Sequence, residues 1–75
     1  MGGQIRHRFG KRVRAQREGQ GISLRRFAMI VGLDKTYLSE VERGMRSPTL
    51  DSMDKIAQGL GIPLSELLKD LDSAS

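Results

Sequence analysis

The chain of 75 residues has no cysteine and no tryptophan, and its only histidine is His7. Without cysteine, neither a disulfide nor a thiolate metal site can hold so short a domain together. The sequence also lacks a signal-peptide pattern and any apolar run long enough to cross a membrane, which predicts a soluble, cytoplasmic protein. A chain of this length buries only about 60% of the surface that its unfolded form exposes, so a single compact helical domain is expected.

The same scarcity argues against two classes of function. His7 lies in a basic stretch without a nearby carboxylate, and neither Ser23 nor Ser39 has a base at helical spacing, so we expect no enzyme and no metal or cofactor. Single-stranded RNA needs an aromatic stacking platform, which this composition does not supply. The chain has only three aromatic residues, namely Phe9, Phe27 and Tyr37.

Positive charge is concentrated in the first part of the chain. Residues 1–46 hold eleven Lys/Arg against four Asp/Glu, a net charge of +7, whereas residues 47–75 hold two against five, a net charge of −3. This asymmetry indicates one surface that faces a polyanion. The alternative is a chance scatter of charge on a small basic protein.

Apolar spacing and capping residues predict an all-α fold, a compact bundle of five helices without strands. Ser23, Asp34 and Thr49 are good N-caps, and Pro63 opens the last helix. We expect a core over about residues 5–71, between a flexible leader at Met1–Gly3 and a frayed tail within Asp70–Ser75. The expected helices, counted together with the residues that cap and terminate them, cover about residues 4–17, 23–32, 34–44, 49–61 and 63–71. The expected inward residues of the first four helices are Ile5, Phe9, Val13, Leu24, Phe27, Ala28, Val31, Leu38, Val41, Leu50, Met53, Ile56, Ala57 and Leu60.

The most informative segment is residues 22–50, where two short amphipathic helices flank a tight turn at Gly32–Leu33. This layout is typical of a helix-turn-helix, whose second helix lies in the DNA major groove. Lys35 and Thr36, with Ser39 and Glu40, share one polar face of that helix and are the expected base-reading residues. A merely solvated helix face is the alternative interpretation.

Two of these residues have specific chemistry. Lys35 can donate to guanine O6 and N7, whereas the carboxylate of Glu40 is repelled by phosphates unless it accepts from cytosine N4 or pairs with a cation such as Arg43. Arg25 and Arg26 stand in the first turn of a helix, where the macrodipole disfavours cations by roughly 0.3–1 kcal/mol each, so a phosphate in front of them would explain their position. The expected phosphate-contacting residues are Arg25, Arg26, Tyr37, Arg43, Arg46 and Ser47.

The order and spacing of these motifs resemble the Cro/repressor-type helix-turn-helix family, also called XRE, over about residues 9–68. Within that family the segment LDKTYLSEVERG is similar to the small controller proteins of restriction–modification systems. The segments that carry the resemblance are Arg17, Gly21-Ile22-Ser23, Phe27-Ala28, Val31-Gly32-Leu33, Tyr37-Leu38-Ser39, Val41-Glu42-Arg43-Gly44, Pro48-Thr49-Leu50, Ile56-Ala57 with Leu60, and Leu64 to Leu68.

The resemblance implies a lambda-repressor-like DNA-binding domain that binds double-stranded operator DNA, commonly as a homodimer on a palindromic site. It also implies a partly buried ion pair between Arg17 and Glu42. The sequence departs from the family at Leu24, where the family usually places a phosphate-binding glutamine. Arg25 and Arg26 would then supply that contact.

The last helices have more apolar positions than a lone domain must bury. Part of this apolar surface is expected to form a symmetric dimer interface, although closure of the bundle's own core remains the alternative. The expected interface residues are Leu64, Leu67, Leu68 and Leu71.

The sequence therefore predicts a sequence-specific, DNA-binding transcriptional regulator. A chain this short has no room for a separate effector pocket, so no small-molecule ligand is expected and regulation would follow protein concentration. The alternative is an antitoxin or adaptor that kept the helix-turn-helix fold for binding another protein.

Overall fold

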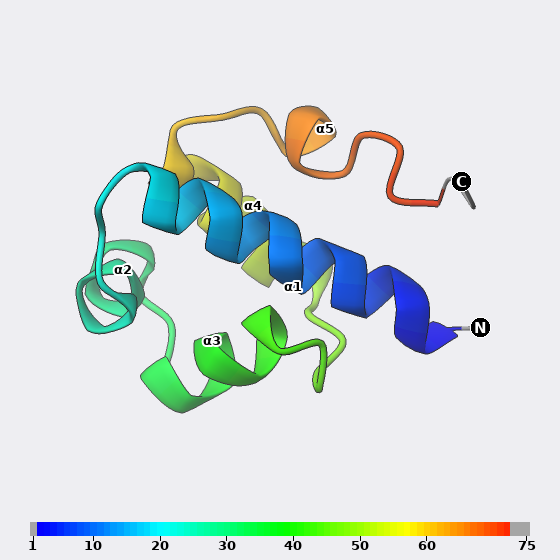
Figure 1. Ribbon diagram of the computed structural model, residues 1–75. Helices are drawn as coiled ribbons and strands as arrows, with labels where there is room; N and C mark the ends of the chain where they lie inside the picture. The colour runs from blue at the N-terminus through cyan, green and yellow to red at the C-terminus, as the bar shows by residue number, and fades with distance from the viewer. Residues whose placement is uncertain (1, 73–75) are drawn as a thin grey trace.

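The computed structural model describes residues 2–72, and every regular element in that range is a helix (Figure 1). Within the same range, no helix combines the length and the hydropathy needed to cross a membrane. The all-α fold with five helices is confirmed. The helices are α1 (Gly2–Gly19), α2 (Leu24–Val31), α3 (Lys35–Glu42), α4 (Leu50–Leu60) and α5 (Leu64–Leu67).

Side-chain caps set where three of the helices begin. The Ser23 hydroxyl accepts from the Arg26 backbone N–H at 3.1 Å, and Asp34 Oδ2 accepts from the N–H groups of Thr36 and Tyr37 at 2.9 and 3.2 Å. Thr49 caps α4 in the same way. Each cap satisfies backbone donors that the helix itself leaves unpaired, so the capping residues in the sequence locate these boundaries.

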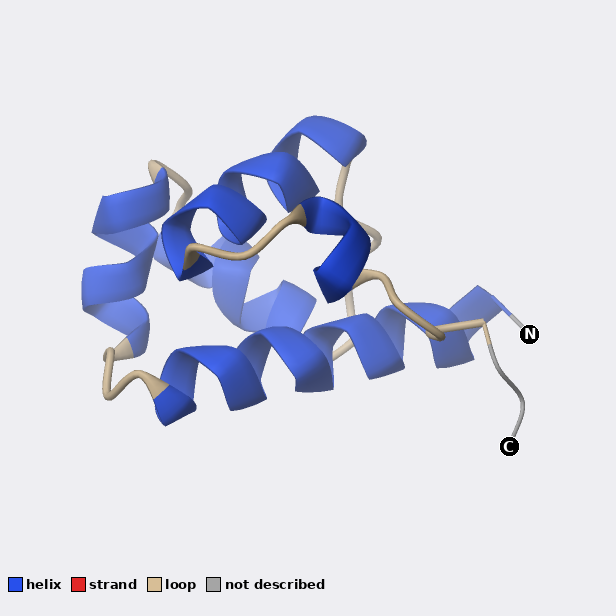
Figure 2. Cartoon of the chain, turned by 90° about the horizontal axis from the view of Figure 1, so that it is seen from above, coloured by secondary structure: helices blue, strands red, loops and turns tan. Residues whose placement is uncertain are grey.

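The helices pack around α1, which is the longest element. In Figure 1, α2 and α3 lie on one side of α1, α5 lies on the other, and α4 packs behind it. Figure 2 shows the same bundle from above, with α1 along one edge and short loops joining the remaining helices. The most extensive contact between two helices joins α1 to α3, and α2 contacts both α3 and α4.

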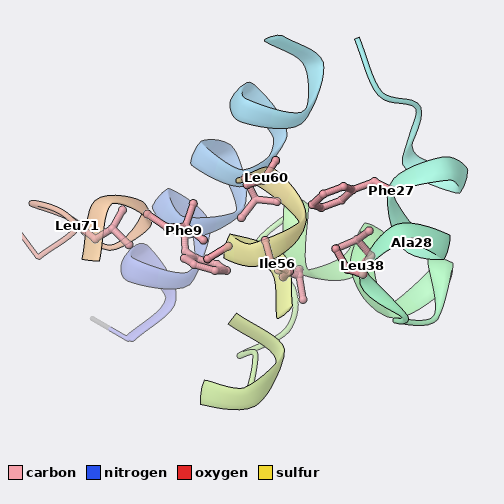
Figure 3. Close-up of a cluster of buried hydrophobic side chains, with 12 residues drawn as sticks. Phe9, Phe27, Ala28, Leu38, Ile56, Leu60 and Leu71 are labelled. Atoms are coloured by element: carbon pink, nitrogen blue, oxygen red, sulfur yellow. The ribbon is translucent and has the colours of Figure 1, made fainter. Parts of the chain in front are cut away.

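Every helix contributes to one hydrophobic core. Phe9, Phe27, Leu38, Ile56 and Leu60 converge from four helices (Figure 3). Side chains of this size contribute roughly 1.5–3 kcal/mol each when they are buried completely. Two expected core residues instead lie at the surface, because Ile5 and Leu50 are 47% and 65% exposed.

The last leucines correct part of the expected dimer interface. Leu67 and Leu71 are 0% and 4% exposed and belong to the core of the single chain, so they offer almost no surface to a second copy. Leu64 and Leu68 are only partly buried against that core. The alternative interpretation, core closure, therefore holds for two of the four residues.

The ordered part of the chain extends into both of the expected flexible ends. Helix α1 already starts at Gly2, so residues 2 and 3 are helical instead of forming a leader. At the other end, Leu71 anchors the chain to the core, and the tail cannot begin at Asp70. Residues 1 and 73–75 of the expected leader and tail lie outside the described range.

Helix α1 approaches the end of α3 so closely that their contact leaves no room for a side chain at Gly10. A Cβ added to Gly10 would lie 2.5 Å from the Glu42 carbonyl oxygen and closer still to that of Val41. These are backbone atoms, which cannot rotate away as a side chain can. The position of α3 on α1 therefore depends on a glycine in the middle of a helix.

We predict that Gly10→Ala destabilises the fold by about 1–3 kcal/mol, because the overpacking strain exceeds the gain of up to about 1 kcal/mol in helix propensity. Thermal unfolding followed by circular dichroism would measure the change. Gly19→Ala is the matched control, since a Cβ at this other α1 glycine meets nothing within 4 Å. Equal melting temperatures for the two variants would contradict the proposed role of the α1–α3 contact.

Candidate nucleic-acid interface

The turn between α2 and α3 fixes the relative direction of the two helices. Gly32 ends α2 with φ of 71°, a left-handed conformation that glycine adopts without steric strain. The N–H groups of Gly32 and Leu33 both donate to the Ala28 carbonyl, at 3.0 and 3.1 Å. Asp34 then caps α3 immediately, so the two helices are joined by a short, hydrogen-bonded turn.

A buried ion pair anchors α3 to α1. Arg17 Nε and Nη2 donate to the two carboxylate oxygens of Glu42 at 2.7 and 2.9 Å, and Nη1 donates to the Ile22 carbonyl at 2.8 Å. Both residues are less than a tenth exposed. The hydrogen bond to Glu42 raises the pKa of Arg17 above its already high ordinary value, so the guanidinium stays charged. The pair that the family resemblance implied is thus present, and it joins three segments.

The opposite face of α3 is free of core contacts. Leu38, Val41 and Glu42 point inward, whereas Lys35 and Thr36 are exposed and Ser39 is partly exposed. No ion pair within residues 2–72 engages Lys35. The first turn of α3 therefore presents an ammonium and a hydroxyl to an incoming partner.

Glu40 has a different partner from the one considered in the sequence. Its Oε1 accepts from Arg46 Nη2 at 2.7 Å and from Arg46 Nε at 3.2 Å, whereas Arg43 Nε turns back to the Ser39 carbonyl at 3.4 Å. The hydrogen bond to Glu40 raises the pKa of Arg46. The Arg46 guanidinium carbon also lies 5.4 Å from the centre of the Tyr37 ring, within the range of a cation–π contact.

The remaining expected phosphate-contacting residues lie on α2, on α3 and in the loop after α3. Arg25 and Arg26 are exposed at the start of α2, and neither makes an ion pair with another residue in 2–72. Ser47 is exposed in the loop after α3, whereas Tyr37 is partly buried against the core. The expected base-reading and phosphate-contacting residues thus belong to α2, α3 and the loop that follows, and these two helices contact each other.

The sequence interpretation missed the role of the arginines on α1. Arg8 donates to the Leu71 carbonyl at 2.9 Å, and Arg12 donates to the Leu67 carbonyl at 3.2 Å and to that of Lys69. The last carbonyls of a helix lack partners within it, and cationic side chains can supply them. In the sequence, the only signal for this role was the excess of arginine on the first helix, α1, which packs against α5.

Helices α2 and α3 are joined by a short turn, and a buried ion pair holds α3 while its outer face exposes polar and cationic groups. This arrangement defines a helix-turn-helix DNA-binding domain. Residues 13–67 match the helix-turn-helix family HTH_3, and the chain belongs to this family. Its control protein relative C.MunI, from a Mycoplasma species, is 42% identical over 69 residues, covering 91% of this chain and 93% of the relative.

Solved structures agree with this assignment. The restriction–modification controller protein C.AhdI from Aeromonas hydrophila superposes with a TM-score of 0.81 and 39% identity, over 83% of this chain and 94% of that one. SinR, a master regulator of biofilm formation solved in complex with DNA, gives a TM-score of 0.77 and 31% identity, over 81% and 98%. The family consists of DNA-binding transcriptional regulators, not enzymes, which confirms the expected class.

We predict that Glu42→Gln destabilises the domain by about 3–5 kcal/mol, because it leaves the buried Arg17 cation without its counter-charge. Chemical denaturation would measure the free energy of unfolding. Glu18→Gln is the control: it breaks the exposed Arg14–Glu18 pair, whose atoms are 3.0 Å apart, and removes an exposed carboxylate 3.9 Å from Arg17, so it should change stability far less than Glu42→Gln. Equal stability of the two variants would mean that the buried pair does not anchor α3.

Proposed function

We propose that this chain reads a palindromic operator as a homodimer, with α3 of each copy in the major groove. The observation that carries the proposal is the rigid mounting of α3: Arg17 and Glu42 fix its inner face while Lys35 and Thr36 remain exposed. A base-reading side chain gains specificity from a fixed helix, because a loosely held donor adapts to any base edge.

The proposed roles divide into base reading and positioning. Lys35 donates to guanine, Thr36 and Ser39 offer hydroxyls, and Glu40 accepts from cytosine. The phosphate contacts fix the domain on the duplex and carry no sequence information themselves. The residues proposed for those contacts are Arg25, Arg26, Tyr37, Arg43, Arg46 and Ser47.

An apolar groove of about 220 Å³ supports the homodimer. Its walls include Ile5 of α1, Pro48, Met53 of α4 and Leu68. Leu50, 65% exposed, precedes Met53 by one turn of α4, so the apolar surface extends beyond the groove. A second copy related by a two-fold axis would cover this surface on both chains with a single interface.

The similarity to C.MunI and C.AhdI supports a controller role in a restriction–modification system. We propose that the protein's own concentration sets operator occupancy, because dimer formation and binding both rise steeply with it. A dependence of operator binding on a small molecule would contradict this part of the proposal.

Selection of bound duplexes from a randomised pool tests the operator. We expect enrichment of a palindrome whose half-site centres are about one helical turn, 34–36 Å, apart. The winner should bind at least about 10³-fold more tightly than a scrambled duplex in physiological salt. An absence of enrichment, with weak binding that disappears as salt rises, would favour the protein-binding adaptor instead.

Lys35→Ala and Arg25→Ala should separate base reading from positioning. Lys35→Ala should relax preference at one position per half-site, costing about 1–3 kcal/mol there, whereas Arg25→Ala should weaken operator and scrambled duplex alike and reduce the salt slope by about 1. Titrations at several salt concentrations measure both effects. Lys55→Ala, which removes an exposed cation of α4, is the control for charge loss alone. The division of roles is wrong if the first two variants behave identically on both duplexes.

A further inference from the structure

The Glu40–Arg46 pair lies on the surface that the proposed function assigns to DNA. Glu40 belongs to α3, and Arg46 belongs to the loop that follows. Two arginine nitrogens, Nε and Nη2, donate to the same carboxylate oxygen, and the guanidinium also lies over the Tyr37 ring. Arg46 is therefore held at two points in the free protein, although its side chain is about half exposed.

The pair has electrostatic consequences for any complex with DNA. A free arginine beside the duplex would neutralise one phosphate and release one counterion, which strengthens binding to every sequence equally. Glu40, 2.7 Å away, cancels that charge. A carboxylate that loses its arginine near phosphates is in turn repelled, unless a base donates to it.

We propose that Glu40 is a specificity-determining residue that withholds Arg46 from the phosphates of non-cognate DNA. This inference rests on the proposed operator-reading function. On the cognate site, a cytosine N4 amine opposite Glu40 replaces Arg46 as the donor to the carboxylate. Arg46 then moves to the DNA backbone and adds a phosphate contact that other sequences do not obtain.

The exchange couples base recognition to backbone affinity. On non-cognate DNA, Arg46 can reach a phosphate only by leaving Glu40 charged and unpaired beside the duplex. On the operator, both charged groups have partners after the exchange. Discrimination at this base pair therefore includes the phosphate contact as well as the hydrogen bond to cytosine.

Binding titrations of Glu40→Gln and of the double variant Glu40→Gln/Arg46→Gln, on the selected operator and on a random duplex over a range of salt, test the proposal. Glu40→Gln should bind the random duplex several-fold more tightly and steepen its salt slope by about 0.9, because Arg46 becomes free to contact a phosphate. On the operator it should gain nothing, so the ratio of the two affinities falls. The double variant Glu40→Gln/Arg46→Gln, which removes both charges of the pair, should make the operator slope shallower by about 0.9 and leave the random-duplex slope unchanged.

Glu18→Gln is the matched control, since it also removes one negative charge and frees an arginine, but on α1. It should leave the random-duplex slope unchanged. The inference is overturned if Glu40→Gln and Glu18→Gln change that slope equally, or if the double variant Glu40→Gln/Arg46→Gln changes the operator and random-duplex slopes alike. If the wild-type chain prefers no duplex, the proposed function itself fails. If Glu40→Gln does not fold, the double variant, which leaves neither charge unpaired, carries the test alone.

Discussion

The buried pair of Arg17 and Glu42 is the interaction on which the arrangement of this domain depends. It connects the last turn of α1, the Ile22 carbonyl before α2 and the last residue of α3. A guanidinium removed from water needs partners for its donors, and here the carboxylate and the carbonyl supply them. Helix α3 is therefore positioned by a bidentate contact with defined geometry, in addition to apolar packing that tolerates small shifts.

The backbone contact between α1 and α3 complements this pair. Gly10 lets α1 touch the carbonyls of Val41 and Glu42, and Gly44 lies against the backbone of His7 in the same way. The ion pair fixes α3 from one end of α1, and these glycine contacts fix it farther along the same helix. Both attachments act on the last residues of α3, and its first turn is held instead by the Asp34 cap and the hydrogen-bonded turn after α2.

Local signals in the sequence were sufficient to locate three helix starts and insufficient to reveal the partners of several charged side chains. Ser23, Asp34 and Thr49 act on backbone groups two or three residues away, so their positions alone located three helix starts. By contrast, the bond from Arg8 to the Leu71 carbonyl depends on how the chain returns upon itself, and the bond from Arg46 to Glu40, six residues apart, depends on the path of the loop after α3. Residue spacing does not contain that information. The face of α3 was predictable, but the partner of Glu40 was not.

The distribution of charge shows why net charge alone describes this surface poorly. Many cations of the basic part already have partners within the chain: Arg8 and Arg12 bind carbonyls near α5, while Arg14 and Arg17 pair with glutamates. Their charge contributes to the long-range field, but their donors are already engaged. The cations on α2 and α3 differ, because no carboxylate in the described part of the chain pairs with them. These cations are Arg25, Arg26, Lys35 and Arg43.

Donors that remain free after folding are the ones that can bind phosphates and bases at little cost, since no internal bond has to be broken first. These free donors, on Arg25, Arg26 and Lys35, occur in the same part of the fold as the firmly held helix, whereas Arg43 already donates its Nε to the Ser39 carbonyl. Arg46 is the exception in this region, because its charge is already paired with Glu40. An arginine with such a partner contributes to binding only where the DNA supplies a replacement donor, and that condition makes its contact dependent on sequence.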